Sequence, residues 1–443
     1  MNYVQILQDS EYKVYYTQSG QILKIPNDRI NSLIDKIEKE KFTDTGIEPF
    51  IKTHKLRKLA ILINNSCNLR CGYCYMDYGN ISGNSTSVSI DLNHLRIALE
   101  NVFRLYEEGI EYIQFFGGEP LLDFEKLESI IHIVNELCQK RNISCPNYGI
   151  VTNGISLTEN MVRAINENNV SLTISIDGPK EIHDAVRINI TGHGSFIKVK
   201  DVVEQYQHKM KNPIIYEMTI NNEHVKHYED GAVKRWMDEV KSMGLQVGII
   251  CLVENSKDNS LNITEQELSI VEKIYQEIVD YFIDELLSGK ENIMVNTQII
   301  EIIQNISKKQ CQHRTCGPGL TQLTFTADGS VAPCTYMLED IYKLGDFSSE
   351  MWQSEKVTQL VKNEFRSKCK KCWATNLCNN FCYIRKENIQ YEGRNISSKC
   401  LANLLLIKRV LSRIIILQKE GKIAKINAGI RRCNKILGRY NVK

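Results

Sequence analysis

The chain has 443 residues, of which 42% are hydrophobic and 24% charged, and its formal net charge is +2. This composition is typical of a globular protein and excludes a largely disordered chain. A charge so close to zero provides no overall attraction to nucleic acid, so we expect no nucleic-acid partner. The unusual number is the 15 cysteines.

The cysteines are expected to be reduced. The first residues, MNYVQILQDS, have no basic segment followed by an apolar one, so no signal peptide is predicted. The most apolar stretch, 401–417, is interrupted by Lys408, Arg409 and Arg413 and is too short to span a bilayer. Clustered cysteines in a cytosolic enzyme bind metal or react more often than they form disulfides. We therefore predict a cytoplasmic protein that has no membrane partner and whose cysteines bind metal.

Residues 1–55 precede the first cysteine motif and form the first predicted domain. Residues 12–16 and 21–25 indicate two short strands around Ser19-Gly20, which is a hairpin signal. Apolar residues at helical spacing follow over 30–37. An element this small cannot bury much surface alone, so we expect it to pack on its neighbours.

A second domain, 56–290, alternates short apolar runs with longer amphipathic segments. The predicted strands are 59–64, 112–116, 147–153, 171–177, 214–220 and 246–253. Helical patterns between them include 93–107, 125–140 and 159–167. Strands separated by helices predict a parallel sheet with right-handed crossovers. The predicted fold class is therefore α/β, as a partial barrel or an open sheet.

The remaining chain divides into two parts. After a long helix predicted over 265–287, residues 291–400 are rich in loops and hold most of the other cysteines. The tail, 401–443, is helical and carries eleven Lys/Arg and one acidic residue. Such a helix either binds an acidic partner, covers the cysteine region or is a solvated face.

Cys67, Cys71 and Cys74 lie within eight residues at the end of the first long strand. A [4Fe–4S] cluster takes four ligands, so three thiolates leave one iron open. A structural zinc site is the alternative and requires a fourth ligand nearby. The nearest histidine, His94, lies inside a predicted helix and is poorly placed to close such a site.

The spacing of these cysteines, with the aromatic Tyr73 before the third, resembles the radical S-adenosylmethionine (SAM) superfamily. The resemblance implies a partial (β/α)6 barrel of the TIM type. It also implies that SAM binds the open iron and that its one-electron reduction yields a 5′-deoxyadenosyl radical, which abstracts a hydrogen atom. In such enzymes the cofactor performs the chemistry and the protein positions it.

Further motifs end successive predicted strands, where α/β sheets bind their ligands. The candidate cofactor-binding residues are Tyr73, Gly117, Gly118, Glu119, Pro120, Asn153, Ser175, Asp177 and Arg187. The resemblance implies that the Gly-Gly-Glu-Pro segment contacts the methionine amino group, that Ser175 contacts the ribose and that Arg187 pairs with the methionine carboxylate. Each short motif alone also suits an ordinary turn, but their order along the strands indicates a SAM site.

Residues 291–400 contain a second cysteine set: Cys316, Cys334, Cys369, Cys372, Cys378, Cys382 and Cys400. This set resembles the SPASM extension of radical SAM enzymes, which implies two auxiliary [4Fe–4S] clusters and three clusters in all. The second auxiliary cluster would take Cys369, Cys372, Cys378 and Cys400. The first would take Cys316, Cys334 and Cys382, with Cys311 as the eighth ligand, although its gap to Cys316 differs by one residue from the expected spacing. A pair of zinc knuckles is the alternative, because spacing alone does not distinguish the two metals.

Four cysteines remain: Cys138, Cys145, Cys251 and Cys433. Buried inert thiols are the default expectation for them. Cys251 ends the sixth predicted strand, where it could face the barrel lumen, and it is the one candidate catalytic residue. There its thiol would hold or quench a radical.

The substrate follows from the SPASM resemblance, since that subset includes enzymes that modify peptides and proteins. Residues 1–55 resemble leader-recognition elements of ribosomal-peptide maturases, in which an exposed strand edge would pair with an extended leader. A simple cap on the barrel is the alternative. Thr335 follows Cys334, whereas sulfatase-maturing relatives carry an aspartate base at that position, which counts against their activity.

The leading hypothesis is a radical SAM enzyme that crosslinks a ribosomally made precursor peptide, consisting of leader and core, most favourably through a thioether. A carbon–carbon or ether bond comes next. A low-potential electron donor such as flavodoxin or ferredoxin is the expected second partner. The alternatives are a protein oxidase of the sulfatase-maturing type and a non-catalytic or electron-transfer iron–sulfur protein.

Overall fold

The structure is a computed structural model. It describes residues 3–8, 10–17, 19–30, 54–77, 87–254, 256, 258–308, 317–350, 352, 355, 357, 372–375, 377–378 and 388–438. The chain forms two compact units. The barrel unit comprises residues 50–263, 317–359 and 434–443, and the helical unit comprises residues 1–49, 264–316 and 360–433. The boundaries predicted at 55, 290 and 400 remain predictions.

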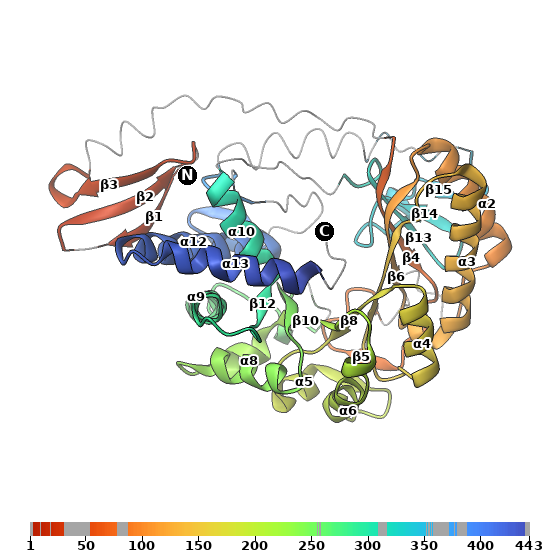
Figure 1. The fold of residues 1–443 in the computed structure, drawn as a ribbon, viewed down its shortest axis with the longest axis horizontal. Helices are drawn as coiled ribbons and strands as arrows, with labels where there is room; N and C mark the ends of the chain where they lie inside the picture. The colour runs from red at the N-terminus through yellow and green to blue at the C-terminus, as the bar shows by residue number, and fades with distance from the viewer. Residues whose placement is uncertain are drawn as a thin grey trace. The chain divides into compact units, whose positions relative to one another are not determined.

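The barrel unit is built on a parallel sheet that confirms the six predicted strands (Figure 1). These are β4 (Leu56–Leu62), β6 (Ile110–Phe116), β7 (Asn147–Thr152), β8 (Ser171–Ser175), β10 (Ile215–Ile220) and β11 (Val247–Leu252). They are adjacent in chain order, and each neighbouring pair is parallel. The carboxyl ends of all six therefore meet at one edge of the sheet, which is where the predicted cofactor motifs lie.

Helices connect these strands, as the sequence pattern predicts. They are α2 (Leu92–Leu105), α3 (Phe124–Arg141), α4 (Glu159–Glu167), α5 (Lys180–Val186), α6 (Phe196–Tyr206), α7 (Asn222–Lys226) and α8 (Ala232–Ser242), with short 3-10 turns η3 (Pro120–Asp123), η4 (Gln207–Lys209) and η5 (Asn259–Leu261). Side-chain caps fix where two of them begin, because Asp91 accepts from the His94 amide and Thr158 from the Met161 amide. Helices α2, α3 and α4 lie along one side of the strands (Figure 1).

Alternating burial along the strands distinguishes the face of the sheet that the helices cover from the opposite face. Tyr216 of β10 is fully buried, and its hydroxyl contacts Met237 of α8. Because successive strand residues point to opposite faces, Glu217 and Thr219 point away from the helices. The same alternation in β11 places Cys251 on the face away from the helices.

The sheet extends beyond β4 in a way that the sequence did not predict. β13 (Gln322–Phe325) pairs parallel to β4, and β14 (Ser330–Ala332) and β15 (Gly345–Asp346) continue antiparallel. The start of the second cysteine region is thus part of the barrel unit's own sheet. A short 3-10 turn, η6 (Asp340–Tyr342), follows in the connection from β14 to β15.

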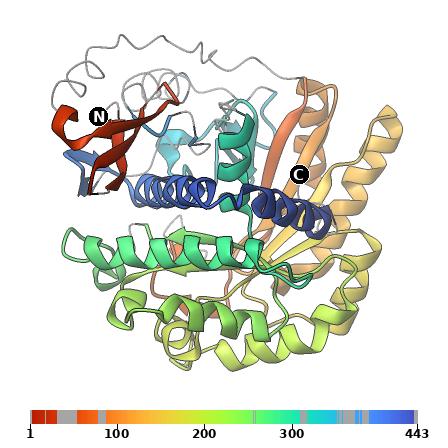
Figure 2. The same ribbon diagram turned by 60° about the vertical axis from the view of Figure 1, so that its left-hand side comes forward.

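The helical unit begins with a three-stranded antiparallel sheet (Figure 2). β2 (Tyr12–Thr17) and β3 (Ile22–Pro26) confirm the predicted hairpin, and β1 (Tyr3–Gln8) is an additional strand. The other elements are η1 (Asn27–Arg29), α9 (Leu268–Leu287), β12 (Val295–Asn296), α10 (Thr297–Lys308), β16 (Ile389–Tyr391), β17 (Arg394–Ile396), α12 (Ser398–Lys419) and α13 (Ile423–Gly438). Most of the helix predicted over 30–37 lies outside the described residues.

The tail is helical as predicted, but α12 is largely buried. Two of its arginines are paired with α9, since Arg409 donates to Asp280 at 2.5 Å and Arg413 donates to Asp284 at 2.6 Å. The basic residues of α12 are therefore partly used inside the unit and do not form an open charged face. Among the described helices, none is long and apolar enough to cross a membrane.

Candidate active site

The three cysteines of the first motif lie on one loop, and a short strand pair connects this loop to the segment that follows α5. β5 (Leu69–Cys71) pairs antiparallel with β9 (Arg187–Asn189), which places Cys71 opposite Arg187. Arg70 holds the loop in shape by donating to the carbonyl of Cys67 at 2.8 Å. Residues separated by more than one hundred positions are thereby brought together as the motif order predicts.

Hydrogen-bond donors surround the sulfurs. The Leu69 amide donates to Cys67 Sγ at 3.4 Å, Asn153 Nδ2 lies 3.9 Å from the same sulfur, and Arg187 Nη1 lies 4.0 Å from Cys71 Sγ. Burial raises the pKa of Cys67 to about 11 and that of Cys71 to about 12, and the neighbouring Cys74 thiol adds to the rise in both. The donors would stabilise the sulfurs as thiolates, which is the form that ligates iron.

The arrangement of the Cys67, Cys71 and Cys74 thiols bears on which metal they would bind. Among the described residues, no group of three or more His, Cys, Asp or Glu side chains is arranged to hold one metal ion. A zinc ion would bring its thiolates to within about 4 Å of one another, since each Zn–S bond is about 2.3 Å. A [4Fe–4S] cluster distributes its ligands over four irons, so three thiols from one loop would hold three of them and leave the fourth open.

Gly117 and Gly118 are required by the backbone of the cysteine loop. A Cβ on Gly118 would lie 2.2 Å from the carbonyl oxygen of Ser66, and one on Gly117 would lie 2.9 Å from that of Asn64. The backbone contacts are close because the Gly118 amide donates to Asn64 and the Glu119 amide donates to Ser66 at 2.7 Å. The two glycines therefore hold the loop against the end of β6.

We expect Gly118→Ala to displace the cysteine loop. Overpacking of this kind costs about 1–3 kcal/mol, and here the clash falls on backbone atoms next to Cys67, so cluster loading should also fall. Urea unfolding and iron content after anaerobic reconstitution measure the two effects. Gly438→Ala is the matched control, because a Cβ there meets open space. Iron content and stability equal to those of the control would contradict this role for Gly118.

Glu119 is engaged inside the protein. Its carboxylate accepts from Thr152 at 2.5 Å, from the Asn153 amide at 2.8 Å and from the Leu121 amide at 3.0 Å. The side chain is buried, which raises its pKa, and the three hydrogen bonds oppose that rise. Glu119 thus ties the end of β6 to the end of β7, and its predicted contact with a bound amino group remains a prediction. Pro120 is buried beside it at the start of η3.

Asp177 is the centre of a second buried network. Arg187 Nε donates to Asp177 Oδ2 at 2.7 Å, and the Tyr73 hydroxyl donates to the same oxygen. The Thr219 amide donates to the other carboxylate oxygen at 2.9 Å. The Asp177 and Arg187 side chains are only 0% and 8% exposed. Asp177 therefore positions Tyr73 and Arg187 beside the cysteine loop, and direct contacts of these three residues with a cofactor remain predictions.

The face of the sheet away from the helices carries polar groups next to this network. Ser175 of β8 stands opposite Glu217 of β10, and Thr219 stands opposite Cys251 of β11. Cys251 Sγ contacts Glu217 Oε1 at 3.8 Å. Cys251 therefore faces the lumen side, as predicted, although no catalytic role is tested. Glu217 was not predicted as a site residue. The feature that could have indicated it is its position as the single carboxylate inside the apolar run IIYEMTI.

Two tyrosines stack where the first cysteine motif and the β14 end meet. Tyr75 directly follows Cys74, Tyr336 is two residues after Cys334, and their ring centroids lie 4.5 Å apart. Both are 42% exposed. The Thr335 side chain forms a hydrogen bond with Tyr75. The position that an aspartate base would occupy in a sulfatase-maturing enzyme is thus taken by a hydroxyl that holds Tyr75.

The second cysteine set is described in part. Cys311, Cys316, Cys369 and Cys382 lie outside the described residues. Cys334 is buried in the barrel unit, and Cys372, Cys378 and Cys400 belong to the helical unit. Cys400 lies in the first turn of α12, where the helix N-terminus favours a thiolate. Of the remaining cysteines, Cys138 and Cys433 are buried, as expected for inert thiols, and Cys145 is exposed.

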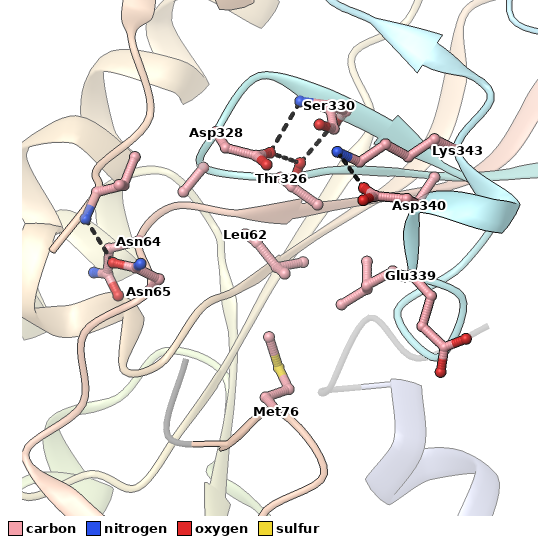
Figure 3. A pocket seen from close by; sticks show the side chains of 14 residues that line it. Leu62, Asn64, Asn65, Met76, Thr326, Asp328, Ser330, Glu339, Asp340 and Lys343 are labelled. Carbon is pink, nitrogen blue, oxygen red and sulfur yellow. Dashed lines mark hydrogen bonds and ion pairs between the residues drawn. The ribbon is translucent and has the colours of Figure 1, made fainter. Parts of the chain in front are cut away.

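A cavity of about 340 Å³ adjoins the end of β4 (Figure 3). Leu62 and Met76 line one part of it, and Asp328, Glu339 and Asp340 line another. Asp328 accepts from Thr326 and from the Ser330 amide, so it fixes the turn between β13 and β14. The described lining includes no cysteine or histidine, and we place the chemistry at the cysteine loop instead.

Residues 61–231 match the Radical SAM superfamily, and residues 316–373 match the SPASM iron-sulfur cluster-binding domain. The cysteine-type anaerobic sulfatase-maturating enzyme of Clostridium novyi (strain NT) is 28% identical over 386 residues, which span 82% of this chain and 98% of that protein. The radical SAM cyclopropyl synthase TigE of Paramaledivibacter caminithermalis is 22% identical over 380 residues, which span 81% and 75%.

Two solved structures share the fold. One is anSMEcpe with bound AdoMet, with a TM-score of 0.67 at 21% identity, covering 85% of this chain and 98% of that one. The other is Streptococcus suis SuiB bound to precursor peptide SuiA, with a TM-score of 0.52 at 12% identity, covering 86% and 95%. The α/β fold predicted from the sequence is confirmed.

Proposed function

Because the chain is a radical SAM enzyme with a SPASM domain, which binds SAM and [4Fe–4S] clusters, we propose that it crosslinks a ribosomally made precursor peptide through a thioether. The observation that carries the proposal is Thr335. It follows Cys334, where a base would serve aldehyde formation, and it is used to hold Tyr75. A threonine hydroxyl does not accept a proton near neutral pH, so the site favours bond formation at carbon over oxidation that depends on such a base.

In the proposed reaction, one C–H bond and one S–H bond of the peptide are replaced by one C–S bond. When bound, the first cluster and SAM together supply a carbon radical that removes a hydrogen atom from the peptide. The peptide's cysteine loses its S–H proton, its sulfur bonds to the carbon radical, and one electron leaves the product. The hydrogen atom goes to 5′-deoxyadenosine. An auxiliary cluster of the SPASM domain would accept that electron, and an external donor such as flavodoxin or ferredoxin would supply the electron for the next SAM.

The protein's own residues position these groups. Asp177 fixes Arg187 and Tyr73 for SAM, and we place the peptide against the face that carries Ser175 and Glu217. Glu217 is the carboxylate nearest Cys251 on that face, and it is suited to receive the peptide's thiol proton. A reducing cytoplasm, which keeps both the ligands and the peptide thiol reduced, is part of this proposal.

Leader recognition by the N-terminal sheet is also a proposal. In this sheet β1 and β3 are the edge strands, and α12 contacts β1 through Ser412, which donates to the Ile6 carbonyl. Among the described residues no strand pairs with the outer edge of β3, and Ile22 is 47% exposed. An extended leader would add a strand to this edge, with main-chain hydrogen bonds supplying affinity.

Co-expression with a short reading frame encoded beside the gene tests the function. We expect the peptide to lose two hydrogen atoms and one alkylatable thiol, because a C–H and an S–H bond are replaced by a C–S bond. Mass spectrometry after iodoacetamide treatment measures both changes. A peptide with that cysteine replaced by serine is the control and should stay unmodified. A peptide that keeps its mass and its thiol in the presence of active enzyme would contradict the proposal.

Sulfatase maturation is the second candidate, and it rests on the similarity to the Clostridium novyi enzyme over nearly its whole length. Its product differs, since a cysteine side chain becomes an aldehyde and its sulfur is lost. A sulfatase-derived cysteine peptide incubated with the reconstituted enzyme separates the two functions. Conversion of that peptide, with the precursor peptide left unchanged, would favour sulfatase maturation.

A further inference from the structure

The hairpin β16–β17 places an arginine beside two of the predicted auxiliary ligands. The Arg394 guanidinium forms a hydrogen bond with Cys372 and lies close to Cys400. All three residues belong to the helical unit. Arg394 reaches Cys400 because β17 ends at Ile396 and α12 begins at Ser398 directly after it.

Several buried N–H groups around these cysteines have no acceptor. Nε and Nη2 of Arg394 are buried without a hydrogen-bond partner among the described residues, and so are Nε1 of Trp373 and Nδ2 of Asn403. Trp373 follows Cys372 in the chain and is fully buried. Asn403 is 7% exposed and lies three residues after Cys400 on α12, which puts both on the same helix face.

Such a gathering is unusual because buried donors in native proteins are almost always satisfied. The nearest carboxylate to Arg394 in the chain, Glu392, interacts with its charge but forms no hydrogen bond with its Nε or Nη2. Glu392 accepts from Lys408 at 3.3 Å, and its other oxygen, Oε2, has no hydrogen-bond partner among the described residues. Arg394 therefore carries unpaired N–H groups beside Cys372, and Trp373 and Asn403 carry further ones close in the chain to Cys372 and Cys400. A bound group with acceptor atoms would satisfy them.

We propose that Arg394, with Trp373 and Asn403, donates hydrogen bonds to the sulfur atoms of the second auxiliary cluster and raises its reduction potential. The inference rests on the proposed ligands Cys372, Cys378 and Cys400, with Cys369 outside the described residues. Reduction adds negative charge to the cluster, and a buried cation with aligned N–H groups stabilises that charge. Hydrogen bonds to sulfur and net charge are established determinants of such potentials.

A raised reduction potential of this cluster would assist the proposed reaction. Formation of the C–S bond releases one electron, and a cluster with a higher potential accepts that electron more readily. Arg394 is thus a positioning residue that acts through the cluster. It does not touch the substrate.

The test measures the potential without any peptide, so failure of the inference and failure of the proposed function are distinguishable. The full chain carrying Cys67→Ala, Cys71→Ala and Cys74→Ala is reconstituted to leave only auxiliary clusters, and its reduced clusters are titrated by electron paramagnetic resonance. With Arg394→Gln we expect the ratio of oxidised to reduced cluster at the parent midpoint to rise about tenfold, which equals 59 mV for one electron. Arg394→Lys keeps the positive charge but loses the planar guanidinium, so its ratio of oxidised to reduced cluster should lie between those of the parent and of Arg394→Gln.

Arg409→Gln is the matched control, because this arginine of the same unit pairs with Asp280 and is not near the cysteines in any described contact; it should leave the potential unchanged. If Arg394→Gln fails to hold the cluster, Trp373→Phe removes one N–H donor and keeps an aromatic ring. It should shift the potential in the same direction by a smaller factor. Midpoints equal to that of the control in the loaded arginine variants and in Trp373→Phe would overturn the inference.

Discussion

Cys71→Ala is expected to abolish the reductive cleavage of SAM. Cys71 stands opposite Arg187 in the β5–β9 pair and shares one loop with Cys67 and Cys74. The open-iron cluster is predicted to have only these three protein ligands, so loss of one should remove its support and the cleavage rate should fall to background.

The measurement is formation of 5′-deoxyadenosine with dithionite under anaerobic conditions, together with iron content. The variant should lose about four irons per chain, because each such cluster contains four. Cys145→Ala is the matched control, since that cysteine is exposed and lies outside both cysteine motifs. Full iron content with normal cleavage in Cys71→Ala would show that the cluster is held elsewhere.

Asp177→Asn should give the second large effect, through the network that positions Arg187 and Tyr73. The substitution keeps the shape of the side chain but removes its charge, which leaves the Arg187 guanidinium buried without a counter-charge. Breaking a buried ion pair in this way costs about 3–5 kcal/mol. Loss of orientation at Tyr73 and Arg187 should also weaken SAM binding by about 10- to 100-fold, which is typical of groups that orient direct contacts.

The pH dependence of stability follows from the same pair. Burial alone would raise the pKa of Asp177, but the charges of Arg187 and His183 and the hydrogen bonds from Arg187 and Tyr73 together outweigh it, so the pKa lies below its ordinary value. A carboxyl whose pKa is lower in the folded state stabilises the protein at neutral pH. That stabilisation is lost as the pH falls through the ordinary carboxyl range near about 4 and below it.

Urea unfolding of the apo protein at several pH values tests this prediction. The wild type should lose stability on acidification more steeply than Asp177→Asn, because only the wild type has this carboxyl to protonate. Asp340→Asn is the control, since Asp340 is exposed and pairs with Lys343 at the surface. Equal stability of Asp177→Asn and wild type at neutral pH would contradict the role given to the network.

The sequence predicted the barrel strands well because their apolar runs are long and separated by clear helical patterns. It missed β1, whose apolar residues Val4 and Ile6 alternate with polar ones over only six positions. It also missed β13, β14 and β15, which have two to four residues each. They join the sheet only because β13 pairs with the distant β4 and the other two follow it. Short strands of this kind depend on tertiary contacts that no local pattern records.

The structure brings together the motifs from which the sequence predicts the site, because these motifs end neighbouring strands of one parallel sheet. It could not show how each carboxylate is used. The structure engages Glu119 and Asp177 with Thr152, Arg187 and backbone amides, and their expected contacts with a cofactor remain predictions. Such internal hydrogen bonds depend on how strands far apart in the chain come together. The expectation of an enzyme is confirmed, and the alternative of a non-catalytic electron carrier is not supported.

The central claim is that the protein removes a hydrogen atom from carbon in a precursor peptide and then joins that carbon to sulfur. The most direct measurement uses a precursor peptide deuterated on carbon, with reconstituted full-length enzyme and unlabelled SAM. We predict one deuterium in the 5′-deoxyadenosine and a peptide that has lost one deuterium and one thiol hydrogen while keeping its sulfur. Unlabelled 5′-deoxyadenosine, or a labelled product from a peptide that has exchanged sulfur for an aldehyde oxygen, would contradict it.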